Sequence, residues 1–517
     1  MAFMNAIRNE LNNEKQLTEN GAVGYRTTGK KLLDLNFSVA SLRGASEQEI
    51  INKFMDAYWE DPVVAIKWLF YTRDARQGLG ERRLFRIVLK HLAQDKPEVI
   101  KAVFSFAPEY GRYDDLWCLL DTDLKANVIS IVKEQLNQDV PNMINGKSVS
   151  LLGKWLPSEN ASSKETKRYA GIIRKGLNMT SRNYRHMLSD LRKHIDVVEC
   201  KMSAKEWAGI NYEAVPSRAN LIYNNAFLRN DEERRRAYLG ALEKGEAKIN
   251  AGTLFPHDIV HKYGRGYNVD ATLEGLWKAL PDTVKGCGNT IVVADGSGSM
   301  TCNVGGKTSV TALEVANSLA IYFAERSSGE FKDKYITFSE RPQLVDFSNA
   351  KTLRDKIGIA LRHNEVANTN IEAVFDLILQ TAINNHMAQE DIPANILIVS
   401  DMEFDSCATS GAPAYSNSWG WYTSSRARPT TTLFDTIAQK YAAHGYKLPR
   451  LVFWNVNSRT GTIPVKENDL GVALVSGFSV NIVNMVMSNK LDPYECLLDV
   501  LNVERYQAIE DAVKSVV

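Results

Sequence analysis

The sequence of 517 residues is poor in cysteine and contains no long apolar run. Its six cysteines are scattered along the chain, at Cys118, Cys200, Cys287, Cys302, Cys407 and Cys496. This spacing argues against a disulfide framework and a cysteine-ligated zinc site, and it indicates a reducing compartment. No run approaches the roughly 18 apolar residues that span a membrane, and residues 1–15 lack a signal-peptide core. We therefore expect a cytoplasmic protein that does not enter a membrane.

Neither sign of charge dominates, because 62 Lys and Arg face 61 Asp and Glu. The balance is uneven along the chain, however. Residues 1–287 hold 43 basic and 36 acidic residues, whereas the remainder holds 19 and 25. A basic part can attract a polyanion and an acidic part can hold a cation, although two ordinary solvated surfaces would give the same numbers. The length exceeds what one core supports, so we expect at least two domains.

The first 287 residues read as helices. Apolar residues recur at helical spacing in residues 47–58 and 63–72, and Asp61 and Pro62 suit the cap and first position of the second helix. Further helices are expected at residues 82–93, 98–106, 114–120 and 124–136. No convincing strand is expected before about residue 285. A long run of helices joined by short turns predicts an α-solenoid of stacked helix pairs.

A basic stretch lies between residues 167 and 194. Its candidate RNA-binding residues are Lys167, Arg168, Arg174, Lys175, Arg182, Arg185, Arg192 and Lys193. Lysine and arginine neutralise phosphates, and the interspersed Tyr169 and Tyr184 could stack on unpaired bases. The alternative interpretation is a solvated helix face with half-buried tyrosines.

Several short motifs in this half resemble a known family. Residues 69–86, with Arg73-Asp74 and Gly80-Glu81-Arg82, resemble the TROVE domain of Ro autoantigen proteins, and residues 111–117 are similar to a helix start that follows there. Residues 154–157, 191–195, 215–218, 247–251 and 254–260 resemble an uncharacterised Ro-like branch more closely. The resemblance implies a monomeric, closed ring of HEAT-like helical repeats in a ribonucleoprotein, which binds small structured or misfolded RNA.

The periodicity changes after Gly286. Strand-like runs at residues 289–295, 335–338, 396–401 and 451–455 alternate with helix-like runs at residues 310–326, 371–385 and 432–444. This alternation predicts a doubly wound, Rossmann-like α/β domain with a mainly parallel sheet. We therefore expect a helical domain over residues 1–287 and an α/β domain over residues 288–517.

Oxygen-bearing side chains follow the strand-like runs. The apolar run from Ile291 ends in Asp295, and Ser297 and Ser299 follow at alternate positions. Asp401 closes a second run, and Thr369 precedes a helix. Because sites in parallel sheets lie at the carboxyl ends of strands, these residues are candidates to converge. One carboxylate and two hydroxyls make a cradle for a small divalent cation.

The pattern Asp295-x-Ser297-x-Ser299 resembles the metal-ion-dependent adhesion site of von Willebrand factor A domains. The resemblance spans about residues 288–517 and implies that these three residues are first-loop ligands. It implies Thr369 as the second-loop ligand, Asp401 as the third-loop ligand, and an open position for an acidic group of a partner. Mg²⁺ is the expected ion, with Mn²⁺ and Ca²⁺ as alternatives. A serine-rich turn without metal would show the same local pattern.

Other motifs do not support an enzyme. Residues 305–308 are similar to the end of a phosphate-binding P-loop, but Thr301 occupies the position that requires glycine. Asp295 likewise replaces the first glycine of a Gly-x-Ser-x-Gly elbow. His257 and His261 lack the glutamate of a zinc-protease helix, so structural roles are expected.

The uncharged, aromatic-rich residues 410–423 predict a partner-contact flap, or a loop packed on its own domain. The sequence thus favours a non-catalytic RNA-binding protein with a divalent-cation adhesion site. The alternative is a metal-dependent protein–protein adaptor that does not bind RNA.

Overall fold

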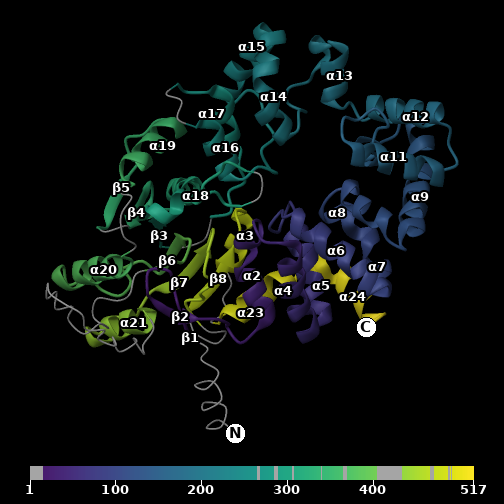
Figure 1. The fold of residues 1–517 in the computed structure, drawn as a ribbon. Helices are drawn as coiled ribbons and strands as arrows, with labels where there is room; N and C mark the ends of the chain where they lie inside the picture. The colour runs from purple at the N-terminus through teal and green to yellow at the C-terminus, as the bar shows by residue number, and fades with distance from the viewer. Residues whose placement is uncertain are drawn as a thin grey trace, which may run out of the picture. The chain divides into compact units, whose positions relative to one another are not determined.

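A computed structural model describes residues 15–264, 268–284, 289–305, 308–338, 341–364, 370–404, 433–465, 471–486, 490 and 492–517 (Figure 1). The chain forms two compact units. The described residues of Met1–Ser46, Phe255–Val269 and Asp282–Val500 form an α/β unit. Those of Glu47–Leu254, Asp270–Pro281 and Leu501–Val517 form a helical unit. The predicted combination of a helical part and an α/β part is therefore confirmed.

The helical unit is built from short helices. They are α4 (Glu47–Glu60), α5 (Pro62–Arg73), α6 (Arg83–Asp95), α7 (Pro97–Val103), η1 (Phe104–Phe106), α8 (Ala107–Tyr110), η2 (Tyr113–Asp121), α9 (Lys125–Ile144), α10 (Leu152–Trp155), α11 (Lys164–Gly176), α12 (Ser181–His194), α13 (Val198–Ala204), η3 (Trp207–Gly209), α14 (Ser217–Asn230), α15 (Glu232–Glu243), α17 (Ala271–Lys278), η7 (Glu504–Tyr506) and α24 (Gln507–Lys514). The expected cap of α5 is present, because the Asp61 side chain accepts from the Val64 amide.

A six-stranded sheet forms the centre of the α/β unit, with strand order β5-β4-β3-β6-β7-β8. The strands are β3 (Thr290–Asp295), β4 (Lys334–Phe338), β5 (Gln343–Asp346), β6 (Asn395–Ser400), β7 (Arg450–Asn455) and β8 (Val472–Ser476). Only the β4–β5 pairing is antiparallel. Every residue of β3 and β8 is buried, as expected for a parallel sheet covered on both faces.

Helices flank this sheet, and α18 packs on β3, β4 and β6. The helices of the unit are α2 (Lys31–Phe37), α3 (Val39–Leu42), α16 (Pro256–Tyr263), η4 (Gly298–Thr301), α18 (Ala312–Arg326), η5 (Gly329–Phe331), α19 (Leu353–Arg362), α20 (Glu372–Asn384), α21 (Leu433–Ala443), η6 (Val480–Ile482), α22 (Val483–Val486) and α23 (Pro493–Leu501). Along the chain, helices thus separate β3 from β4, β5 from β6 and β6 from β7, as the alternating pattern predicted.

The expectation of no strand before about residue 285 is wrong. A hairpin of β1 (Lys15–Leu17) and β2 (Val23–Tyr25) belongs to the α/β unit. Tyr25 and Ile463 exchange two main-chain hydrogen bonds, of 2.8 and 2.9 Å. Each strand has only three residues, so neither can show the alternation by which strands are predicted. These two strands are stabilised by main-chain contacts with residues distant in sequence, such as Ile463.

Each unit contains segments from both sides of the boundary predicted at residue 287. The helix α16 packs on α18 in the α/β unit, where His261 Nδ1 lies 2.9 Å from Glu314 Oε2. His257 is buried between the rings of Phe255 and Phe478. The C-terminal helix α24 instead packs on α5 and α7 in the helical unit.

In the described part of the chain, no helix combines the length and apolarity needed to cross a membrane.

Candidate metal centre

The strands β3 and β6 bring two acidic loops together at one edge of the sheet. They are parallel neighbours, with Ala294 paired to Val399, so Asp295 and Ser400 follow side by side. Asp401 comes directly after β6. The carboxyl ends of parallel strands share an edge. The structure therefore brings the loops that carry Asp295, Ser297, Ser299 and Asp401 to one edge of the sheet, where the sequence predicts a metal site.

We call the loop after β3 the first loop and the loop after β6 the third loop. Hydrogen bonds fix the conformation of the first loop. The Ser297 amide donates to Asp295 Oδ1 at 2.9 Å, and the hydroxyls of Ser297 and Ser299 lie 3.0 Å apart. On the other side, the Ser400 hydroxyl donates to Asp295 Oδ2 at 2.6 Å. The same hydroxyl accepts from the Met402 amide at 2.9 Å. Ser400 thus links the first and third loops, a role that its position beside Asp401 could have suggested.

Both carboxylates of the site are buried, and each is only 1% exposed. Burial raises the pKa of Asp295 to about 7, and the charge of Asp401 adds to the rise. Hydrogen bonds from Ser297 and Ser400 oppose it. Burial also raises the pKa of Asp401, against a hydrogen bond from Ser299. Two buried carboxylates are costly to ionise together, so the site favours a cation.

An orphaned oxygen supports this interpretation. Asp401 Oδ2 is buried and accepts no hydrogen bond from the described residues. The Arg459 guanidinium is 3.6 Å away. Two carboxylates and two hydroxyls are the hard oxygen donors that Mg²⁺ prefers, so these residues fit a small divalent cation. Within the described ranges no three His, Cys, Asp or Glu side chains form a metal cluster, and the donor set depends on its serines.

Asn364 is a further candidate donor that the sequence did not suggest. A Cβ atom added to Gly296 would lie 3.5 Å from Asn364 Oδ1, so the amide lies over the first loop. Both polar atoms of this amide are buried without a hydrogen-bond partner among the described residues. Thr369, the predicted second-loop ligand, lies outside the described residues. The loop at residues 410–423, the predicted flap, lies outside them too.

The third loop turns sharply after Asp401. Met402 is buried and has a φ of 63°, in the left-handed region that non-glycine residues seldom adopt. The next residue, Glu403, is completely buried. Its Oε1 accepts from the main-chain amides of Arg459 and Thr460, each at 2.9 Å. This turn directs a second acidic side chain inward, where it fastens the loop after β7.

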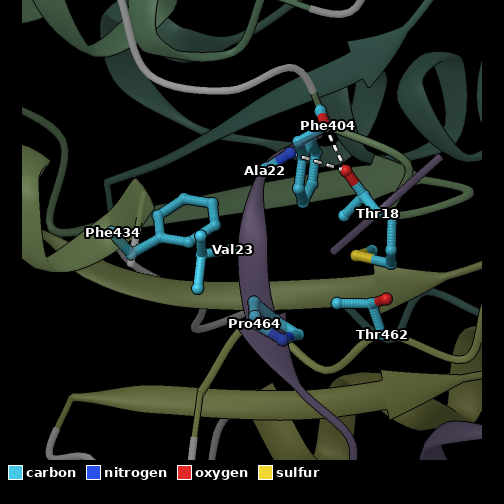
Figure 2. A pocket seen from close by; sticks show the side chains of 9 residues that line it. Thr18, Ala22, Val23, Phe404, Phe434, Thr462 and Pro464 are labelled. Carbon is cyan, nitrogen blue, oxygen red and sulfur yellow. Dashed lines mark hydrogen bonds between the residues drawn. The ribbon is translucent and has the colours of Figure 1, made fainter. Parts of the chain in front are cut away.

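The N-terminal hairpin lies against the same loop (Figure 2). The Phe404 carbonyl accepts from the Thr18 hydroxyl at 2.5 Å and from the Ala22 amide at 3.4 Å. A cavity of about 10 Å³ lies between these residues, Met402 and Phe434. This volume holds no more than a water molecule, so the region is a packed contact and not a ligand pocket.

The basic residues predicted to bind RNA separate into two groups. Three have partners inside the helical unit: Arg168 bonds Asp121, Arg174 bonds Glu159, and Arg192 donates to the Gly153 and Leu156 carbonyls. The other five are exposed, namely Lys167, Lys175, Arg182, Arg185 and Lys193. Arg174 and Arg192 are half-buried and serve the packing of α11 and α12, whereas Arg168 is exposed like the second group.

One of the two tyrosines of this stretch cannot stack on a base as predicted. Tyr184 is fully buried, and its hydroxyl donates to the Pro157 carbonyl at 2.9 Å. The expectation that it stacks on a base is therefore wrong, because α12 turns this ring toward the core. Tyr169 is half-buried, and its hydroxyl lies 3.2 Å from Asp121 Oδ2.

Comparisons with known proteins find similarity along most of the chain. Residues 289–514 match the family model described as "Domain of unknown function (DUF7788)". Residues 18–104 and 162–289 match "Domain of unknown function (DUF2828)". "Uncharacterized protein L728" of Acanthamoeba polyphaga mimivirus is 29% identical over 526 residues, which cover 94% of this chain and 86% of that protein.

A solved structure, that of the Deinococcus radiodurans RO (RSR) protein, aligns with 92% of this chain and 93% of its own. The TM-score is 0.31 and the sequence identity is 13%. The two family matches meet at residue 289, just before β3. The chain is thus similar, in its two consecutive parts, to two families whose descriptions state no function, and over nearly its whole length to a mimivirus protein.

Proposed function

We propose that this protein is a non-catalytic, divalent-cation-dependent binding protein. Its α/β unit would hold Mg²⁺ and present it to an acidic group of a partner. The convergence of Asp295 and Asp401 with two serine hydroxyls supports this proposal, because Asp401 Oδ2 is buried without a hydrogen bond from the described residues. A von Willebrand A-like adhesion site, as the sequence motif suggests, has this donor set.

Each residue has a separate part in the proposed site. Ser400 and the Ser297 amide orient the Asp295 carboxylate, and the Glu403 amide donates to Asp401 Oδ1 at 3.3 Å. When bound, the ion supplies a coordination position for an external oxygen. The hydroxyls of Ser297 and Ser299 contact each other, and their acidic neighbours are the two candidate metal ligands, Asp295 and Asp401. This arrangement suits binding better than group transfer.

Removal of the metal tests the proposal. An ion at about a hundredfold its Kd stabilises a folded protein by about 2.7 kcal/mol, so Mg²⁺ should raise the melting temperature above that measured in EDTA. Asp295→Ala should abolish this increase. Glu330→Ala, which removes an exposed carboxylate of the same unit, should keep it. A wild-type melting curve that is identical in Mg²⁺ and EDTA would remove the site.

RNA binding by the helical unit is a second candidate function, favoured by the exposed charges of α11 and α12. Lys167 and Lys175 are eight residues apart on α11, and Arg182, Arg185 and Lys193 share a face of α12. All five are exposed, and of these Arg185 lies close enough to Glu159 to lower the pKa of that carboxyl. Such a surface neutralises phosphates, in line with the Ro-like interpretation of the sequence.

Charge reversal tests this candidate. A triple variant, Lys175→Glu, Arg182→Glu and Arg185→Glu, should weaken binding to a structured RNA at low salt and reduce the salt dependence of the affinity. Lys205→Glu, Arg229→Glu and Lys244→Glu make a matched control, because these residues are exposed on α13–α15 and the adjoining turns. A wild-type protein that purifies without nucleic acid and does not shift RNA would exclude the candidate.

A further inference from the structure

The loop after β7 brings a guanidinium to the metal site. Arg459 Nη2 lies 3.6 Å from Asp401 Oδ2 and 2.5 Å from Glu19 Oε2. These three residues come from the hairpin, the third loop and the loop after β7, and all belong to the α/β unit. Arg459 therefore lies between a candidate metal ligand and a carboxylate of the N-terminal hairpin.

The buried carboxylate of Glu403 holds the main chain of both members of the Arg459–Glu19 ion pair. Glu403 Oε1 accepts from the Arg459 amide at 2.9 Å, and Glu403 Oε2 accepts from the Glu19 amide at 2.9 Å. The hairpin is also held by Asn20, whose side-chain amide donates to the Glu403 carbonyl at 2.6 Å. Because main-chain bonds place both residues, their side chains can exchange partners without movement of the backbone.

Exposure increases outward from the metal site. Asp401 is buried, whereas the side chain of Arg459 is 38% exposed and that of Glu19 is 54% exposed. The guanidinium thus has one edge toward the site and another toward solvent, where a carboxylate already binds it. Guanidinium groups recognise carboxylates through two parallel hydrogen bonds.

We propose that Arg459 is a second anchor for the acidic group that binds at the metal, and that Glu19 occupies this anchor until a partner's carboxylate displaces it. The inference rests on the proposed function of the site. The partner is an acidic peptide segment. The anion that the guanidinium holds is a carboxylate, and the acidic excess after residue 287 disfavours a nucleic acid.

The proposal makes opposite predictions for the cation and the anion. A positive charge next to Asp401 repels a divalent cation, so the loss of Arg459 should leave metal affinity unchanged or increase it. The same loss should weaken the binding of an acidic peptide. Loss of the Glu19 carboxylate should have a third effect, because it frees the guanidinium and strengthens peptide binding.

The experiment measures binding of a labelled hexaglutamate peptide to the full chain in Mg²⁺ by fluorescence anisotropy. Glu19→Gln should tighten binding roughly two- to fivefold, the scale of one exposed ion pair. Arg459→Gln should weaken it by about tenfold or more, because it removes charged hydrogen bonds. Glu330→Gln and Lys332→Gln are matched controls near the opposite end of β4, and neither should change the affinity.

Measurement of Mn²⁺ binding by electron paramagnetic resonance distinguishes failure of the proposed function from failure of the inference about Arg459. If the wild-type chain binds no Mn²⁺, the proposed function fails. If all variants bind Mn²⁺ but Glu19→Gln binds the peptide no more tightly than the wild type, the inference is overturned. It is also overturned if Arg459→Gln retains wild-type affinity, or if an oligouridylate displaces the peptide at equal concentration. Equal melting temperatures of the variants establish that each is folded.

Discussion

Ser400 shows how one hydroxyl can support a whole site. It donates to Asp295 Oδ2 and accepts from the Met402 amide, and it is completely buried. The hydroxyl therefore satisfies a carboxylate on the neighbouring strand and an amide in the strained turn. Mutation of a group that orients a metal ligand typically lowers metal affinity about ten- to hundredfold.

We expect Ser400→Ala to destabilise the chain by about 1–3 kcal/mol, because the buried Met402 amide and Asp295 Oδ2 lose their partner. Urea unfolding in EDTA measures this effect. In Mg²⁺ titrations the same variant should bind the ion about tenfold more weakly. Ser328→Ala, at an exposed serine of the same unit, is the control. Wild-type stability and wild-type metal affinity in Ser400→Ala would contradict this role.

At the scale of elements, the N-terminal hairpin fits the α/β unit closely. A Cβ atom on Gly24 would lie 2.7 Å from the Ile463 carbonyl and 2.5 Å from Thr462 Cγ2. Main-chain atoms cannot give way as a flexible side chain can. The absence of a side chain at position 24 thus permits the two hydrogen bonds between Tyr25 and Ile463.

Gly24→Ala should accordingly lower stability by about 1–3 kcal/mol, the usual cost of overpacking. Gly358→Ala, within α19, is a control of opposite sign. Among the described atoms, only the end of the Arg362 side chain lies within 4 Å of that position, and alanine is the better helix former by about 1 kcal/mol. Thermal melting of both variants tests the pair. A hairpin that tolerates alanine at position 24 without loss would show that it is held loosely.

The C-terminal helix α24 is a second element held by distant contacts. Glu510 Oε2 lies 2.5 Å from Nζ of the buried Lys67 on α5, and Lys514 pairs with Glu510 Oε1. The hydrogen bond from Lys514, followed by that from Lys67, lowers the pKa of Glu510 below its ordinary value of 4.5. The ionised carboxylate therefore stabilises the folded helical unit.

Because the folded pKa is lowered, this stabilisation is fully present above the ordinary pKa and is lost as the pH falls through the folded value. Glu510→Gln should remove it, at a cost of about 1–2 kcal/mol near neutral pH. The difference from the wild type should shrink between about pH 5 and pH 3. Urea midpoints across this range measure the effect, and a difference independent of pH would contradict it.

At the scale of the whole molecule, the two compact units share the chain in an interleaved way. The α/β unit takes residues from before 47 and from around 260, and the helical unit takes the residues after 500. A cut at residue 287 therefore separates α18 from α16, and β7 and its loop from the hairpin. Each compact unit is therefore built from three separate stretches of the chain, and a continuous half of the sequence does not correspond to either unit.

We predict that residues 288–517 alone do not fold as the α/β unit does in the intact chain. The fragment exposes Glu403 and Ile463, which the hairpin contacts, and it leaves α24 without α5. Its thermal transition should be broad or absent by circular dichroism. A chain that joins residues 15–46 and 255–500 through a flexible linker is the comparison. A sharp transition of the shorter fragment at the temperature of the intact chain would contradict this prediction.

The sequence by itself determined the features that depend on neighbouring residues. The apolar run of β3, the cap of α5 and the change from helical to alternating pattern each lie within a few residues, where period and chemistry can be read directly. The placing of Asp295 and Asp401 followed from a general rule, since parallel strands end at one edge. The prediction that Ser297 and Ser299 lie in the same loop as Asp295 required only their spacing in the sequence.

Only the tertiary structure decided the rest. Glu19 and Glu403 are 384 residues apart, yet a hydrogen bond joins them. Nothing in the local sequence of Arg459 indicates that it approaches Asp401, or that β1 and β2 are strands. Such contacts form because the sheet brings distant loops to one edge, and the buried carboxylate of Glu403 must then find donors wherever the chain supplies them.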